Sequence, residues 1–191
     1  MLPMSEFIDF VTELFPSIRP YTKEQVKASI QQFDRSGVQR NFSMHSALPY
    51  LAQGDIFGDA IPFFKQDKDG NLSVLRTKAI LLSNTCDSER DDVLIFAPLI
   101  PIKDLKLDEH AIKSNQIYRL LYFPDPIISN YVVDFSLLNS FSRQLFEEQL
   151  KQGNFKKTLS LNDLGYYLFL CKLTIHLMRP EDGEVQKTRS A

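Results

Sequence analysis

The sequence of 191 residues is poor in the residue types on which several classes of protein depend. Its two cysteines, Cys86 and Cys171, are too few for a disulfide scaffold, and we expect two free thiols in a reducing compartment. The three histidines are widely spaced and no Cys-x-x-Cys pair occurs, so no metal site is expected. The seven glycines form neither a Gly-x-Gly-x-x-Gly motif nor a Gly-Lys-Ser/Thr ending. The sequence therefore predicts no cofactor.

Long apolar runs and a dominant charge are also missing. The longest apolar stretches, 93–102 and 166–171, fall far short of the roughly 20 residues that span a bilayer. The first residues lack the basic and apolar regions of a signal peptide. With 22 basic and 24 acidic side chains, the net charge of −2 creates no global attraction to DNA or to an anionic membrane. We therefore expect a cytoplasmic protein without membrane contact.

Residues 1–51 are expected to form an N-terminal helical segment. Apolar side chains recur at helical spacing from Phe7 to Leu14, with Ser5 as the capping residue. A second stripe, from Val26 to Phe33, follows Thr22, which begins a capping box. Two short amphipathic helices result, and each needs another surface on which to bury its apolar stripe.

Residues 52–140 change from helical to extended patterning. An Asp-Gly turn lies in the polar loop Lys65–Asn71, a strong hairpin signal. The polar stretch Asn84–Asp92 is expected as a loop, and Pro98 is expected to end the strand before it. Five strands are predicted, at 56–64, 72–83, 93–97, 118–123 and 131–135. Short strands with close turns favour a small antiparallel sheet or barrel.

Residues 141–180 are expected to be helical again. One helix is predicted over Ser142–Lys151. A longer helix is predicted to be capped by Ser160, with Asp163 at the box position, and to end at Pro180. Its apolar stripe from Leu161 to Met178 is so broad that most of its sides must be buried. Residues 181–191 are polar and are expected to form a flexible tail.

The most informative polar stretch is Ser83-Asn84-Thr85-Cys86-Asp87. It places a hydroxyl, an amide, a thiol and a carboxylate where a buried strand ends, and such positions commonly line sites. Cys86 is a candidate nucleophile if a histidine approaches it in the fold. The alternative is that Asn84 and Asp87 make side-chain-to-backbone turns while Cys86 is a small buried hydrophobe.

Two cations precede that stretch on the same predicted strand. Arg76 and Lys78 flank Thr77, so the period of two puts both on one face. That face is either a site for phosphate or carboxylate or simply a solvated surface. The candidate binding residues are thus Arg76, Lys78, Ser83, Asn84 and Asp87, and the candidate catalytic residues are Arg76, Ser83, Thr85 and Cys86.

Three stretches together resemble the MazF/PemK toxin family. They are Gln53-Gly54-Asp55-Ile56-Phe57, Lys78-Ala79-Ile80-Leu81-Leu82-Ser83-Asn84 and Val93-Leu94-Ile95-Phe96-Ala97-Pro98-Leu99. Their order and approximate spacing match the family over residues 53–99, about a quarter of the chain. The resemblance implies an SH3-like barrel. We therefore expect an α+β fold, with a small SH3/PemK-like antiparallel barrel, two N-terminal helices and a long C-terminal helix.

The family cleaves RNA without a metal, by an arginine in an Arg-Pro pair and a Thr or Ser at the start of the Val-Ile-Val-Ala strand. Here Thr77-Lys78 occupies the Arg-Pro position, with Arg76 one residue early, and the later strand begins at Asp91-Asp92. We therefore expect the catalytic pair to be lost and the chain to be a binding or interaction protein.

Two enzymatic functions remain as alternatives. The first is an endoribonuclease with displaced residues, in which Arg76 stabilises the phosphate and Ser83 or Thr85 lies near the scissile bond. The second is a Cys86-dependent hydrolase. A protein partner is expected, with RNA and a second copy of the chain as further candidates.

Overall fold

The fold is α+β, as the sequence predicts, with one antiparallel sheet and a long C-terminal helix. The structure is a computed structural model that describes residues 41–178 and 183–189. The two expected N-terminal helices lie outside the described residues. The sheet has seven strands in the order β4-β5-β3-β2-β1-β7, with β6 paired to β3.

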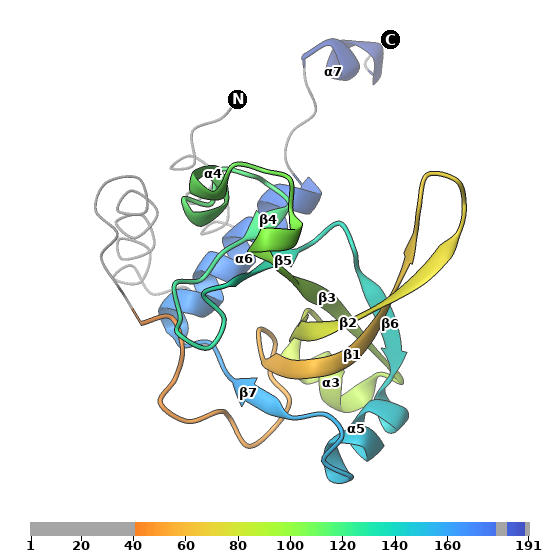
Figure 1. Ribbon diagram of the computed structural model, residues 1–191, viewed down its shortest axis with the longest axis vertical. Coiled ribbons are helices and arrows are strands. Elements are labelled where there is room, and N and C mark those ends of the chain that lie inside the picture. The colour runs from red at the N-terminus through yellow and green to blue at the C-terminus, as the bar shows by residue number, and fades with distance from the viewer. Residues whose placement is uncertain (1–40, 179–182, 190–191) are drawn as a thin grey trace.

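The described elements have the following bounds. The strands are β1 (Ile56–Gln66), β2 (Leu72–Leu81), β3 (Val93–Pro101), β4 (Leu120–Leu121), β5 (Tyr131–Asp134), β6 (Asn139–Ser142) and β7 (Lys157–Leu159). The helices are α3 (Thr85–Arg90), α4 (Glu109–Lys113), α5 (Arg143–Lys151), α6 (Asp163–Met178) and α7 (Gly183–Arg189), with a 3-10 turn η1 at Ile102–Asp104. Figure 1 shows the long β1–β2 hairpin projecting from the body.

The third strand runs through Pro98, so the expectation that this proline ends it is wrong. In antiparallel pairing, even-numbered residues of β3 turn their backbone groups away from β2 and towards β5 and β6. On that side β6 pairs only as far as Phe96, and β5 begins at Leu99. Pro98 lies in the gap between these two partners, where no N–H is required.

Four short elements were not expected where they occur. Strands β6 and β7 have no predicted counterpart, and the polar stretch expected as a loop contains α3. Residues 183–189 of the expected tail form α7.

The N-terminal cap of α6 also differs from the expectation. Helix α6 begins at Asp163, and its capping oxygen belongs to Asn162, which accepts from the Gly165 N–H at 3.0 Å. Ser160 is therefore not the cap.

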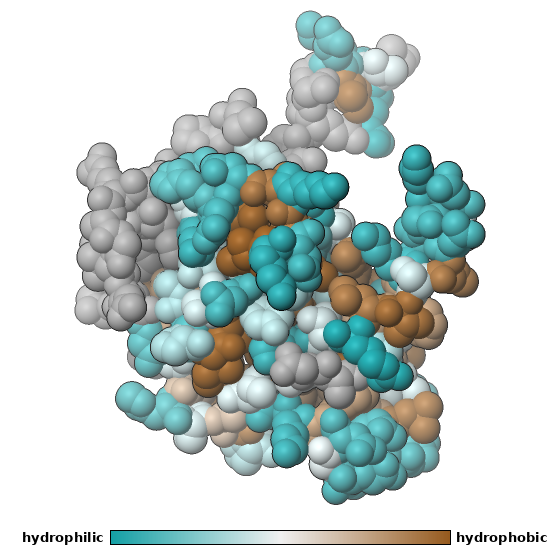
Figure 2. Space-filling view, viewed as in Figure 1, coloured by the Kyte–Doolittle hydropathy of each residue, from teal (hydrophilic) through white to brown (hydrophobic). Residues whose placement is uncertain are grey.

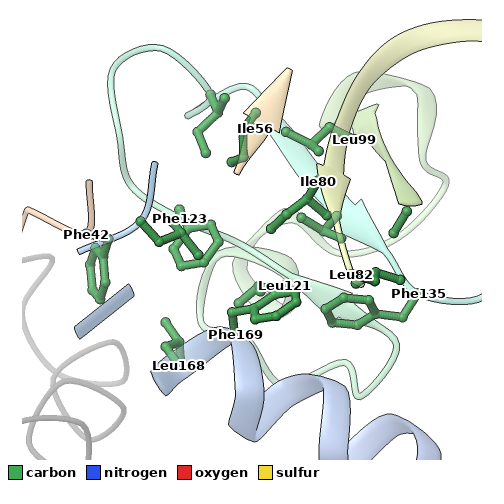
Figure 3. Packing of buried hydrophobic residues seen from close by; sticks show 14 of the residues in the cluster. Phe42, Ile56, Ile80, Leu82, Leu99, Leu121, Phe123, Phe135, Leu168 and Phe169 are labelled. Carbon is green, nitrogen blue, oxygen red and sulfur yellow. The ribbon is translucent and has the colours of Figure 1, made fainter. Parts of the chain in front are cut away.

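Side chains are buried on both faces of the sheet. One face packs on α6, where Leu168 and Phe169 lie beneath Leu121, Phe123 and Phe135 (Figure 3). Burial on both faces explains why the central strands read as almost continuous apolar runs.

The opposite face holds a cluster of phenylalanines that α5 covers. Phe146 of α5 stacks on Phe96 with ring centroids 4.6 Å apart and meets Phe57 edge-on at 5.1 Å. Phe141 joins the cluster from β6, 5.4 Å from Phe96. Aromatic pairs at these distances contribute about 0.5–1.5 kcal/mol each beyond their buried area.

Backbone pairing in the described residues does not close the sheet, so the closed barrel is not confirmed. Strands β1 and β6 nevertheless approach each other. The Phe64 N–H donates to Asn139 Oδ1 at 2.8 Å, and Asn139 Nδ2 donates to the Phe64 carbonyl at 3.3 Å. One asparagine side chain therefore bridges the gap where a barrel would close.

A buried lysine fixes α6 to the loop before β4. Lys172 is 1% exposed, and its Nζ donates to the carbonyl oxygens of Asn115 and Ile117 at 2.9 and 2.8 Å. Burial lowers the pKa of this ammonium to about 7. Asn115 has a positive φ of 57° and exchanges two hydrogen bonds with the backbone of Tyr122.

Candidate functional site

The predicted strand-end stretch forms the entry to α3, and its side chains hold backbone groups. The Ile95 N–H donates to Ser83 Oγ at 2.9 Å. Asn84 is the N-cap of α3 and accepts from the Cys86 N–H at 3.0 Å, as the side-chain-to-backbone alternative predicts. Thr85 Oγ1 accepts from the Gln53 N–H at 3.1 Å. These bonds order the turn that follows β2.

The two other members of this stretch point to solvent. Cys86 and Asp87 are both exposed, so the alternative of Cys86 as a buried hydrophobe is wrong. Both cysteines are free thiols, and Cys171 is the buried one.

The two predicted cations differ in environment. Arg76 is exposed and lies across from Pro62, whereas Lys78 is buried, with its Nζ 5.1 Å from the centroid of the Tyr131 ring. Between them, the Thr77 hydroxyl donates to the Leu99 carbonyl at 2.6 Å. Arg76 and Ser83 are seven residues apart on a largely extended chain, about 23 Å at 3.3 Å per residue. A separation of this length along the chain disfavours Arg76 and Ser83 as a displaced ribonuclease pair.

A pocket of about 730 Å³ opens beside the strand end. It lies between the segment 41–53 and the first turn of α6, and Thr85 is the predicted site residue that borders it. Its lining comprises Asn41, Met44, Leu48, Tyr50, Ala52, Gln53, Thr85, Leu161, Asn162, Asp163, Leu164 and Tyr166.

A buried ion pair holds one wall of this pocket in place. The carboxylate of Asp55, 1% exposed, lies 2.6 Å from Lys157 Nζ and accepts from the Ser160 hydroxyl at 2.5 Å. The Lys157 ammonium also donates to the carbonyl oxygens of Leu48 and Tyr50. Through Lys157, strand β7 thereby fixes the backbone of the segment 48–52, which forms this wall.

The polar end of the pocket is ordered by Gln53. Its Nε2 donates to the Leu82 carbonyl at 2.7 Å, and its Oε1 accepts from the Tyr166 hydroxyl at 2.8 Å. Burial raises the pKa of Tyr166, so this hydroxyl keeps its proton at neutral pH. Sequence patterns did not single out Gln53 or Tyr166 as site residues, because they are more than 100 positions apart.

A second feature is the exposed face of the β1–β2 hairpin. Phe64, Leu72 and Val74 are 62%, 73% and 53% exposed. Phe64 pairs with Val74 and Gln66 with Leu72, so the three apolar side chains share one face. Figure 2 shows hydrophobic side chains gathered beneath the hydrophilic tip of this hairpin.

Several kinds of site are not found in the part of the chain that the structure describes. No three His, Cys, Asp or Glu side chains gather to hold a metal ion there. None of the helices described is long and apolar enough to cross a membrane. Comparison of the chain with protein families, with curated proteins and with solved structures found no match.

Proposed function

We propose that this chain is a cytoplasmic binding protein, built on a barrel of the MazF/PemK type, that engages a protein partner through the exposed face of the β1–β2 hairpin. One observation carries the proposal: Phe64, Leu72 and Val74 lie together and are more than half exposed. Large apolar side chains gathered on one exposed face mark sites of protein association. The asparagine bridge between β1 and β6 supports the barrel.

Charge narrows the chemistry of the partner. Residues 61–77 carry three basic side chains, Lys65, Lys68 and Arg76, and two acidic ones. The segment 52–140 as a whole carries nine basic and thirteen acidic side chains, so the hairpin is its more positive part. The complementary partner surface is an apolar stripe bordered by carboxylates.

The hydroxyl groups near the strand end support binding rather than catalysis. A nucleophile or phosphate-binding hydroxyl must reach substrate. Thr77 is buried and its hydroxyl donates to a backbone carbonyl, while Ser83 accepts from a backbone N–H. Both positions serve the strand pairing, in agreement with a lost catalytic pair.

Photocrosslinking from the hairpin tests the proposal. A benzophenone amino acid replaces Val74 in one variant and Leu145, a comparably exposed side chain on α5, in a matched control. We expect a discrete adduct with another protein from position 74, which Phe64→Ser abolishes, and none from position 145. Equal adducts from both positions would contradict the proposal. An adduct of twice the mass of the chain would identify the bound partner as a second copy of this chain.

Induction of the chain in a bacterial host separates binding from RNA cleavage. The proposal predicts growth without arrest while the protein accumulates, for the wild type and for Arg76→Ala alike. Growth arrest that Arg76→Ala relieves would refute it in favour of the endoribonuclease.

A further inference from the structure

The pocket between the segment 41–53 and α6 is preformed. At about 730 Å³ it falls within the roughly 300–1,000 Å³ of typical ligand sites. Lys157 fixes the carbonyls of Leu48 and Tyr50, and the Leu48 N–H donates to Ser160 Oγ at 2.9 Å. On the other side, Asn162 Nδ2 donates to the Asn41 carbonyl at 2.8 Å. A wall tied at both ends needs little ordering when a ligand enters.

The described lining combines apolar and aromatic side chains with polar ones and carries a single charge. Four aliphatic side chains, Met44 and two tyrosines, Tyr50 and Tyr166, line it beside polar side chains. Asp163, which is exposed, is the charged residue among the described lining, and that lining contains no Lys, Arg or His. The nearby Lys157 contacts the wall from behind, and its charge is balanced by Asp55 at 2.6 Å.

Two polar groups of the pocket, the Tyr166 hydroxyl and the Asp163 carboxylate, can accept hydrogen bonds from a ligand. The Tyr166 hydroxyl already donates its proton to Gln53 Oε1, so its oxygen is left as an acceptor. The Asp163 carboxylate adds two more acceptor oxygens. Tyr50 is 49% exposed, while its carbonyl is bound by Lys157, so the backbone is held and the ring is accessible. An accessible tyrosine ring attracts cations over its face.

The start of α6 opposes this charge pattern only in part. A helix N-terminus carries the equivalent of about +0.5 charge. Here the Asn162 side chain caps the helix by accepting from the Gly165 N–H. The full negative charge of Asp163 in the first turn is larger than the partial positive charge of the capped helix N-terminus.

From these features we infer a second binding site, distinct from the hairpin face, for a small organic cation with an apolar or aromatic body. The ammonium, amidinium or guanidinium group lies between the Asp163 carboxylate and the tyrosine rings. The apolar body packs on Leu48, Leu161 and Leu164. An anion of the same shape is repelled by Asp163 and finds no basic side chain in the described lining.

Three probes of one shape test the inference on the full chain. Benzamidine is cationic, benzyl alcohol neutral and benzoate anionic, and each is titrated into ¹⁵N-labelled protein while amide chemical shifts are recorded. We expect benzamidine to shift the amides of Tyr50, Gln53, Thr85 and Asp163 with saturation in the millimolar range. Benzyl alcohol binds more weakly, and benzoate produces no saturable shift.

Two variants locate the charge and the ring. Asp163→Asn should weaken benzamidine binding about two- to fivefold, as expected for one exposed ion pair. Tyr50→Ala retains the carbonyl that Lys157 binds and should weaken binding by a similar factor. The control Asp69→Asn removes an exposed carboxylate at the hairpin tip and should leave the affinity unchanged. Benzoate binding as tightly as benzamidine, shifts confined to other residues, or equal effects of Asp163→Asn and Asp69→Asn would each overturn the inference.

Discussion

We expect the stability of the wild-type chain to rise between pH 7 and pH 9, and we expect replacement of Lys172 by methionine to remove that rise. The side chain is 1% exposed, and its Nζ contacts two backbone carbonyls. Among the described residues, no carboxylate forms a salt bridge with it. Burial lowers the pKa of Lys172 from an ordinary 10.5 to about 7.

The sign of the effect follows from where the proton is held. Between pH 7 and 10.5 the unfolded chain keeps the proton on Lys172 and the folded chain loses it. The unfolded state therefore binds more protons, and the free energy of unfolding rises with pH by about 1.4 kcal/mol per unit at most. This stability is fully present above pH 10.5 and is lost as the pH falls towards 7.

The expected gain in unfolding free energy from pH 7 to pH 9 is about 2 kcal/mol, because Lys172 in the folded chain is half protonated at pH 7. The two bonds to carbonyl oxygens favour the ammonium form, so this is an upper value. The window ends at pH 9 because burial raises the pKa of Cys171 from 9.0 to about 12. Above pH 9 its thiolate forms in the unfolded chain first, which lowers stability.

Urea unfolding at pH 7, 8 and 9 measures the effect. The unfolding free energy of the wild type minus that of Lys172→Met should become more positive from pH 7 to pH 9. The control Lys113→Met alters an exposed lysine paired with Glu109 at 2.6 Å and should parallel the wild type. Wild type and Lys172→Met curves that run parallel would show that Lys172 stays charged in the folded chain, and would refute the reasoning.

Three further changes have defined outcomes in the same urea assay. Gly165→Ala should cost about 1–3 kcal/mol, because its Cβ would lie 2.2 Å from the Phe42 carbonyl oxygen; unchanged stability would show that this contact yields freely. Asp55→Asn should cost about 3–5 kcal/mol at pH 7, because it leaves the Lys157 charge without its partner; a loss below 1 kcal/mol would mean that the pair is solvated. Asn84→Ala should cost about 1 kcal/mol through loss of the α3 cap, whereas Asp87→Ala, beside it, should cost less, and the reverse order would contradict the cap.

The elements that the sequence predicts are those with their own hydrophobic pattern. Strands β2 and β3 contain long apolar runs, and α6 carries a stripe of over four turns. Strand β6, with the sequence Asn-Ser-Phe-Ser, and β7, with Lys-Thr-Leu, have no such pattern. They are strands because distant partners, β3 and β1, present open edges to them. Pairing between distant segments leaves no periodic signal in a short strand.

The candidate sites show the same division between local and distant information. The Asn84 cap is a local interaction, and the turn alternative predicts it correctly. The pocket combines Gln53 and Thr85 with Tyr166, and its wall is fixed by Lys157, whose role depends on distant backbone groups and leaves no local pattern in the sequence. The sequence also does not predict that Phe64 is exposed, because Phe63 beside it has the same side chain and is 1% exposed.

The pairing of β1 with β7 has a consequence for synthesis of the chain. Ile56 lies opposite Leu159, so the strand that pairs with this edge of β1 is synthesised about a hundred residues later. At about 5–20 residues per second, a ribosome takes several seconds to deliver that partner. During this interval the nascent chain presents an unpaired strand edge, beside a hairpin whose apolar face is never covered within the described chain. The time between the two segments, and not only the final fold, therefore sets how long a nascent chain is exposed to edge-to-edge aggregation.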